Sequence, residues 1–111
     1  MDVKLVLDTI LRKEDLYYPF LAGFFDANGS VDLRLPTMIL KLTQAELHLF
    51  ILEKIRAYGE RYGLYFLPPR IRGKEKQRLA GNPKIRTKSG VWDMELRTYS
   101  NETFLNKVIL T

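Results

Sequence analysis

The apolar positions at the start of the chain recur with helical periodicity: Val3, Val6, Leu7, Ile10 and Leu11. This spacing predicts an amphipathic helix over residues 2–13. A second helix is predicted over residues 19–27, because proline is favoured in the first turn and the residues after Pro19 are apolar almost all round. Such a helix is buried on more than one side, and Gly29 is expected to end it in the left-handed conformation.

Strict alternation of apolar and polar residues follows, which is typical of strands with one buried face. It predicts strands over residues 31–35 and 37–43, joined by a turn at Pro36–Thr37. Apolar positions then return to helical spacing, so a helix is predicted from residue 43 or 44 to about residue 58. We expect one of the glycines that follow, Gly59 or Gly63, to end it.

Two more strands and a helix complete the predicted elements. The third strand covers residues 64–72, and Pro68–Pro69 predicts an edge strand or a bend there because proline donates no ladder hydrogen bond. The fourth strand covers residues 91–99 and places Trp92 toward the core. Ser100 or Asn101 is expected to cap the last helix.

The predicted order is helix, helix, hairpin, helix, hairpin, helix, which favours the α+β class with an antiparallel sheet. The helices would cover one face of the sheet, and the other face would be polar and basic. Such a face suits the DNA major groove, which admits β-ribbons. On this face we predict six DNA-binding residues: Arg34, Lys41, Thr43, Arg70, Arg72 and Arg97.

The charge of the chain supports a polyanionic partner. The net charge is +5, and the pI is about 9.6. Basic residues concentrate between residues 70 and 97, and residues 73–90 are predicted to form a long basic loop or an extended hairpin tip. Charge alone leaves DNA or RNA binding and a solvated loop without a partner equally open.

The length and composition limit the remaining possibilities. A chain of 111 residues corresponds to one domain, here residues 1–111. No apolar run approaches the roughly 18 residues of a membrane span, and the start of the chain lacks the layout of a secretory signal. The absence of cysteine excludes disulfides and zinc-thiolate sites. We therefore expect no membrane partner and an intracellular location, in the cytoplasm or in a eukaryotic organelle.

Gly23 is unexpected within an apolar helix, since glycine costs about 1 kcal/mol there relative to alanine. Close approach of a second helix would compensate for this cost, because Ala22 and Gly23 are small. The alternative is that Gly23 accommodates a bulky neighbour in the same chain. A chain with one copy of this segment would obtain the second helix from a partner chain.

Residues 21–30, read Leu-Ala-Gly-Phe-Phe-Asp-Ala-Asn-Gly-Ser, are similar at nearly every position to the LAGLIDADG motif of homing endonucleases. Without residues 1–14, an N-terminal helical extension, the predicted order matches one such unit, α-β-β-α-β-β-α. Residues 42–44 and the helix after them also resemble single-motif members. The resemblance implies a saddle-like antiparallel sheet and a homodimer on near-palindromic double-stranded DNA. It places Ala22, Gly23 and Asp26 at the dimer interface.

The resemblance also implies a Mg²⁺ site at the base of the paired helices. Its protein ligands would be the backbone carbonyl of Ala27 and the side chain at position 28, which is aspartate in the family and Asn28 here. Asparagine offers only a neutral oxygen, so metal binding and cleavage are predicted to fall severely. Gln44 lies where the family has a glutamine beside the active site, and its alternative role is that of a polar residue at a helix start. Asp26 more simply makes a hydrogen bond or an ion pair near the helix end.

These observations favour site-specific DNA binding by a protein that resembles an intron- or intein-associated homing endonuclease, with endonuclease activity impaired by Asn28. The alternatives are a non-catalytic DNA-binding regulator, an RNA-binding maturase and a structural domain without nucleic acid. The narrow major groove of A-form RNA disfavours the maturase. His48 is the only histidine, and metal binding by it is not expected.

Overall fold

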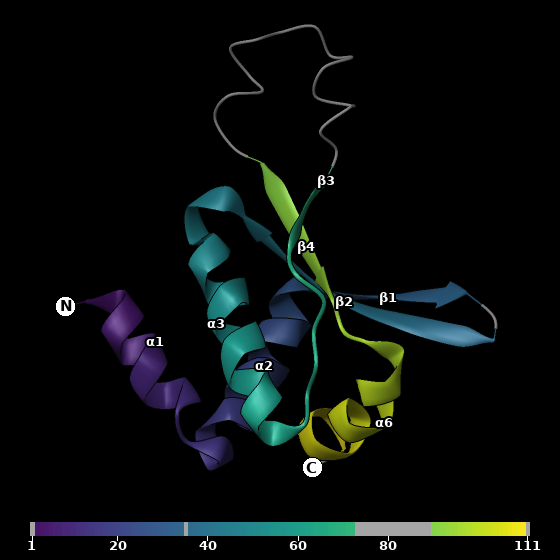
Figure 1. Ribbon diagram of the computed structural model, residues 1–111, viewed down its shortest axis with the longest axis horizontal. Helices are drawn as coiled ribbons and strands as arrows, with labels where there is room; N and C mark the ends of the chain where they lie inside the picture. Colours follow the sequence, from purple (N-terminus) through teal and green to yellow (C-terminus); the bar gives the residue numbers. More distant parts are fainter. Residues whose placement is uncertain (1, 35, 73–89, 111) are drawn as a thin grey trace, which may run out of the picture.

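The computed structural model describes residues 2–34, 36–72 and 90–110. The chain has the predicted α+β class, with helices packed on an antiparallel sheet (Figure 1). Its elements, which include short 3-10 and π-helical segments (η), are α1 (Val3–Leu11), α2 (Glu14–Asn28), β1 (Gly29–Arg34), β2 (Thr37–Ala45), η1 (Glu46–His48), α3 (Leu49–Gly59), η2 (Glu60–Tyr62), β3 (Arg70–Arg72), β4 (Val91–Glu95), η3 (Thr98–Ser100), α6 (Asn101–Phe104) and η4 (Leu105–Ile109).

The sheet has four strands in the order β1-β2-β4-β3, and every pairing is antiparallel. The edge position predicted for the third strand is therefore confirmed. Figure 1 shows that the β1–β2 pair and the β4–β3 pair extend from the helical body in different directions. The central strand β2 carries buried Leu40 and Leu42 on the face that meets α2 and α3. Alternation then turns Lys41 and Thr43 to the opposite face.

The core lies between this sheet and the helices. Leu21 of α2 and Leu52 of α3 are fully buried in it. Tyr17 is also fully buried, and its hydroxyl donates to the carbonyl oxygen of Ile55 at 2.8 Å. Burial raises the pKa of Tyr17, so the hydroxyl remains protonated and able to donate. This hydrogen bond joins α2 directly to α3.

The amphipathic helix at the N-terminus is confirmed as α1. Asp2 caps it, because its Oδ1 accepts from the backbone N–H of Lys4 at 3.0 Å. Asp8 fastens α1 to α3 by accepting from Lys54 Nζ at 3.0 Å and from the Tyr58 hydroxyl at 3.2 Å. The hydrogen bond from Lys54 lowers the pKa of Asp8, which keeps this carboxylate charged.

Helix α2 begins five residues earlier than the pattern predicted, at Glu14 instead of Pro19. The prediction that Pro19 occupies the first turn is therefore wrong, and Pro19 lies inside the helix. Two features favour the earlier start. Glu14 and Asp15 in the first turn complement the helix dipole, and burial of Tyr17 offsets the hydrogen bond that Pro19 cannot donate.

The expected left-handed end of α2 at Gly29 is also wrong. Gly29 has φ −97° and ψ 160°, so the chain passes straight from α2 into β1. Glycine is required there for another reason, since a Cβ would overlap the ring and carbonyl oxygen of Phe25. The left-handed glycine is Gly63, with φ 84°, at the end of η2.

Several predicted element bounds need correction. Residues 43 and 44 belong to β2 and do not begin a helix; η1 and then α3 follow. Only Arg70–Arg72 of the predicted strand 64–72 forms a regular ladder, because Pro68–Pro69 supplies no donors. The stretch before it still pairs through Phe66 and Leu96, and the Leu67 N–H donates to the Glu95 carbonyl at 2.8 Å. The fourth strand accordingly ends at Glu95 and not at Tyr99.

The start of the last helix at Asn101 is confirmed, but the predicted capping hydrogen bond is absent. The Ser100 hydroxyl instead accepts from the backbone N–H of Tyr65 at 3.1 Å. Asn101 Nδ2 donates to the Met38 carbonyl oxygen at 2.8 Å, which attaches the helix to β2. Long-range partners therefore took over both candidate capping side chains.

Three further expectations have separate outcomes. The apolar face of β1 is less covered than a half-buried strand predicts, since Leu33 is 70% exposed. Trp92 is half-buried against the core, and its Nε1 donates to Glu46 at 3.3 Å. The predicted basic loop lies outside the described residues except for Gly90. None of the described helices combines the length and apolarity needed to cross a membrane.

Replacement of Tyr17 by phenylalanine should lower the free energy of unfolding by about 1 kcal/mol, because it removes the hydrogen bond to Ile55 and preserves the packed ring. Urea unfolding followed by circular dichroism measures the change. Tyr99→Phe is the matched control, since Tyr99 is 68% exposed and loses no described hydrogen bond. Equal stabilities for the two variants would contradict this role of Tyr17.

Candidate nucleic-acid interface

The side of the sheet opposite the helices carries the residues predicted to bind DNA; we call it the outer sheet face. The register places Lys41 opposite Glu95, and Thr43 opposite Asp93. Arg70 pairs with Asp93 from the other side, so Arg70 and Arg72 project from the same face. Arg34 on β1 shares this face because it pairs with Thr37. Arg97 follows β4 and is exposed.

Three of these arginines are paired with carboxylates. Arg72 makes the tightest pairing: its Nε and Nη2 donate to both oxygens of Asp93, at 2.7 and 2.6 Å. Thr43 completes the group, since its hydroxyl donates to Asp93 at 2.7 Å and accepts from Arg72 Nη2 at 3.0 Å. Three neighbouring strands therefore contribute one connected polar group.

The other two pairs are looser. Arg70 Nη2 lies 2.7 Å from a Glu95 oxygen, but the Arg70 side chain is 75% exposed. Arg34 Nε lies 2.9 Å from Asp32, also in an exposed setting. Exposed single contacts of this kind contribute little to stability and are readily exchanged for another anion. Among the described residues, Lys41 and Arg97 have no ion pair on this face.

The charges on the outer sheet face are fully developed near neutral pH. Partial burial acts to raise the pKa of Asp93, but hydrogen bonds from Arg72 and Thr43 outweigh it and hold the pKa below its usual value. The same hydrogen bond raises the pKa of Arg72. The described face therefore remains basic, with five cations against three carboxylates: Arg34, Lys41, Arg70, Arg72 and Arg97 against Asp32, Asp93 and Glu95.

Two shallow hollows adjoin Glu95 on this face. One, of about 450 Å³, is lined by Leu67, Pro68, Arg70 and Glu95. The other, of about 190 Å³, reaches Arg97 and Tyr99. The Tyr99 ring lies 6.0 Å from that of Tyr65, so exposed aromatic surface borders the basic residues. Sequence reasoning missed Tyr65, although its position in the predicted third strand was available.

The residues predicted for chemistry lie where α2 meets the sheet. Ala27 is exposed and Asn28, the last residue of α2, is half-buried. Gln44 is near the end of β2, and its side-chain oxygen accepts from the Ala45 N–H at 2.9 Å. Because Gly29 pairs with Leu42, Asn28 and Gln44 lie at the same end of the β1–β2 pair.

The donors present in one protomer fit Mg²⁺ poorly. Ala27 and Asn28 offer a backbone carbonyl and a neutral amide oxygen, whereas Mg²⁺ favours carboxylates. Asp26 is exposed on another side of α2. Within residues 2–34, 36–72 and 90–110, no group of three or more acidic, histidine or cysteine side chains is placed to hold a metal ion.

Helix α2 has one uncovered side, which includes Gly23. A Cβ at Gly23 would meet no atom within 4 Å, so no bulky neighbour in the described chain explains this glycine. Asp26 is exposed on the same helix, whereas Ala22 packs partly against the core. The exposed residues recur with helical periodicity and define what we call the open α2 stripe: Leu16, Pro19, Gly23, Asp26 and Ala27.

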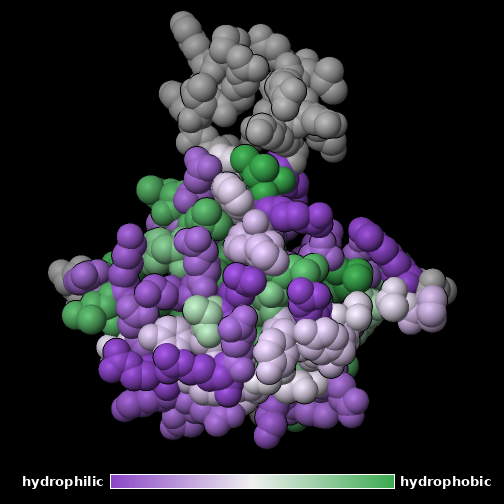
Figure 2. All heavy atoms as spheres, in the orientation of Figure 1, coloured by the Kyte–Doolittle hydropathy of each residue, from purple (hydrophilic) through white to green (hydrophobic). Residues whose placement is uncertain are grey.

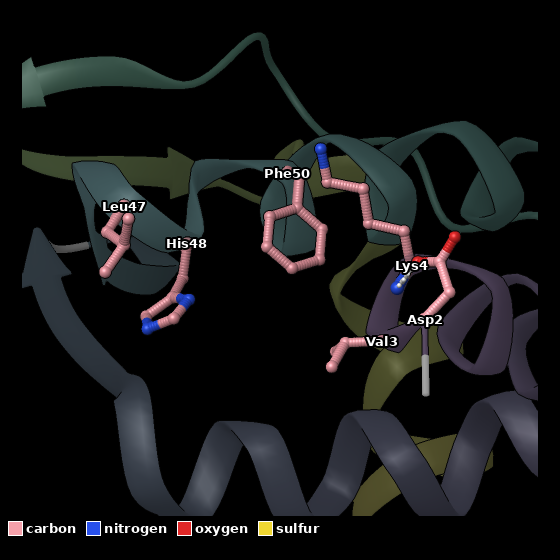
Figure 3. A pocket seen from close by; sticks show the side chains of 6 residues that line it. All are labelled: Asp2, Val3, Lys4, Leu47, His48 and Phe50. Atoms are coloured by element: carbon pink, nitrogen blue, oxygen red, sulfur yellow. Dashed lines mark hydrogen bonds between the residues drawn. The ribbon is translucent and has the colours of Figure 1, made fainter.

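A larger hollow, of about 570 Å³, lies between the start of α1 and the η1–α3 junction (Figure 3). Val3, His48 and Phe50 point into it. Figure 2 shows a largely hydrophilic face with some apolar surface along the flank that contains α1. None of the predicted DNA or metal residues lines this hollow, so it is separate from the outer sheet face.

No family model, no curated protein and no solved structure matches this chain. The functional argument consequently depends on the geometry of the outer sheet face, the open α2 stripe and the end of α2.

Proposed function

We propose that this protein binds specific sites on double-stranded DNA as a homodimer, in an intracellular compartment, and that it resembles a LAGLIDADG homing endonuclease. The observation that carries the proposal is the outer sheet face. It holds five basic side chains on strands that extend beyond the helical body (Figure 1). Basic β-ribbons of this kind can enter the major groove and neutralise phosphates on both sides of it.

The shape of this face favours duplex DNA over RNA. A four-stranded sheet is too wide for the deep, narrow major groove of A-form RNA, whereas the major groove of B-DNA accepts two strands side by side. An RNA-binding maturase is therefore the weaker alternative. A non-catalytic DNA-binding regulator remains the stronger one, because it requires the same sheet face and no metal.

The open α2 stripe supports self-association. Two copies of α2 can approach closely at Gly23, and the rotation between them would place two outer sheet faces on successive half-sites. A two-fold symmetric protein of this kind recognises a near-palindromic sequence. Burial of Leu16 and Pro19 would supply apolar contact area at the same interface.

Catalysis is proposed to be weak or absent. When bound, Mg²⁺ would supply Lewis-acid chemistry for phosphodiester hydrolysis. Asn28 contributes no negative charge to such a site, and a dimer would lack two charges. Gln44, at the same end of the β1–β2 pair, remains available to position a water by its amide. This arrangement preserves DNA positioning and removes the ligand charge that cleavage requires.

The binding proposal predicts a steep dependence of affinity on salt. Each phosphate contact contributes a slope of about 0.9 to the plot of log affinity against log salt concentration. Duplexes selected from a random pool, with and without Mg²⁺, would identify the site and its symmetry, and fluorescence anisotropy would give the slope. A flat plot, or no enriched sequence, would refute site-specific DNA binding.

The homodimer proposal predicts that Gly23→Leu abolishes self-association without harming the protomer. The new side chain meets open space within one chain, and loss of a helical glycine stabilises the protomer by about 1 kcal/mol. Sedimentation velocity measures the mass, and thermal unfolding measures stability. Ala57→Leu, at an exposed position of α3, is the control. A Gly23→Leu protein with the same dimer affinity as wild type would overturn the interface.

The catalytic argument predicts that Asn28→Asp gains Mg²⁺-dependent nicking or cutting of the selected duplex, because it restores the anionic ligand. Gel assays of supercoiled plasmid containing the site detect either product. Asn106→Asp, which adds the same charge at an exposed position of η4, should remain inactive. If Asn28→Asp cuts no better than this control, loss of the acid does not explain the inactivity.

A further inference from the structure

Arg72 differs from the other basic residues of the outer sheet face in how many of its hydrogens are already engaged. It donates three hydrogen bonds, two to Asp93 and one to Thr43. The guanidinium group has five N–H donors, so only the two on Nη1 are free of partners among the described residues. The fork formed by Nε and Nη2, which normally grips phosphate, is occupied by a carboxylate.

Asp93 is built into this position more firmly than a surface carboxylate. Its side chain is 16% exposed, and both of its oxygens accept hydrogen bonds, from Arg72 and from Thr43. Arg70 contrasts with it, since a single contact links it to Glu95 and its own side chain is 75% exposed. Arg70 can turn toward a phosphate at little cost, whereas Arg72 must first give up three hydrogen bonds.

Pairing also changes which DNA groups Arg72 can contact. A phosphate is an anion, and the carboxylate of Asp93 repels it and competes for the same fork. The base edges in the major groove are neutral acceptors, for example guanine N7 and O6. The free Nη1 hydrogens can reach such an acceptor while the contacts to Asp93 remain intact.

We infer that Asp93 is a positioning residue for DNA specificity: it withholds Arg72 from phosphates and directs its free Nη1 hydrogens to neutral base acceptors. The inference depends on the proposed function, in which the outer sheet face binds duplex DNA. Lys41 and Arg97, which have no ion pair among the described residues of this face, then supply phosphate contacts. Discrimination between sequences comes from Arg72 and its fixed carboxylate.

The experiment measures affinity for two labelled duplexes, one of random sequence and one most enriched by selection on the wild-type protein. Asp93→Asn removes the charge and keeps the shape, so Arg72 becomes available to a phosphate. One added phosphate contact per protomer steepens the salt slope by about 0.9, which raises affinity about eightfold at roughly 0.1 M salt. Affinity for the random duplex should rise by this factor, and the ratio between the two duplexes should fall by at least as much.

Two further variants separate this effect from a general change of charge. Glu53→Gln makes the same charge change at an exposed position of α3, outside the outer sheet face, and should change the salt slope little. The double variant Arg72→Gln with Asp93→Asn restores the net charge of the wild type. It should bind the random duplex with the wild-type salt slope, but lose about 5- to 150-fold in affinity for the enriched duplex through loss of a base contact.

The outcomes distinguish the inference from the function it depends on. A wild-type protein that binds neither duplex refutes the proposed function. If wild type binds but Asp93→Asn has the same slope and duplex ratio as Glu53→Gln, only the inference is overturned. Thermal unfolding reports whether each variant is folded. Should Asp93→Asn fail to fold, the double variant decides, since a slope shallower than that of wild type would mean that Arg72 already contacts phosphate.

Discussion

Helix α2 must serve two surfaces at once, and the rest of the structure depends on how it does so. Its buried side carries Tyr17 and Leu21, which join it to α3 and to the core. Its other side leaves Gly23 uncovered. Its last residue, Asn28, passes directly into β1 without a turn because Gly29 permits close approach to Phe25. One rigid helix thereby fixes the sheet, the uncovered stripe and the position of Asn28 relative to one another.

The continuous passage from α2 into β1 also determines which residues can act together. It sets the register in which Gly29 pairs with Leu42, and this register brings the end of α2 beside the end of β2. The same register, carried through β2 to β4, places Thr43 beside Asp93. Support for the outer sheet face therefore begins at a glycine on the far side of the strand from any charge. A larger residue at Gly29 would displace both sites together.

Periodicity predicted the class, the element order and the buried face of β2, because a local pattern decides those features. It failed where a distant partner decided the outcome. Burial of Tyr17 extended α2 past Pro19, and the Tyr65 N–H engaged the Ser100 hydroxyl that was expected to cap a helix. The six candidate DNA residues do lie on exposed or partly exposed surface. Their pairing was missed, because alternation assigns a side chain to a face but does not specify its partner across the strand.

Those pairings alter what a basic surface means for recognition. Free cations attract any polyanion, so a face with five of them would bind duplexes of every sequence strongly. Carboxylates spaced among the arginines reduce this common term and leave contacts that depend on base identity as a larger share of the total. Specificity is a difference between affinities, and it improves when the weaker competitor loses more. The acidic residues of the outer sheet face therefore belong to the recognition surface as fully as its arginines, and Asp93, the most enclosed of them, has the largest influence on it.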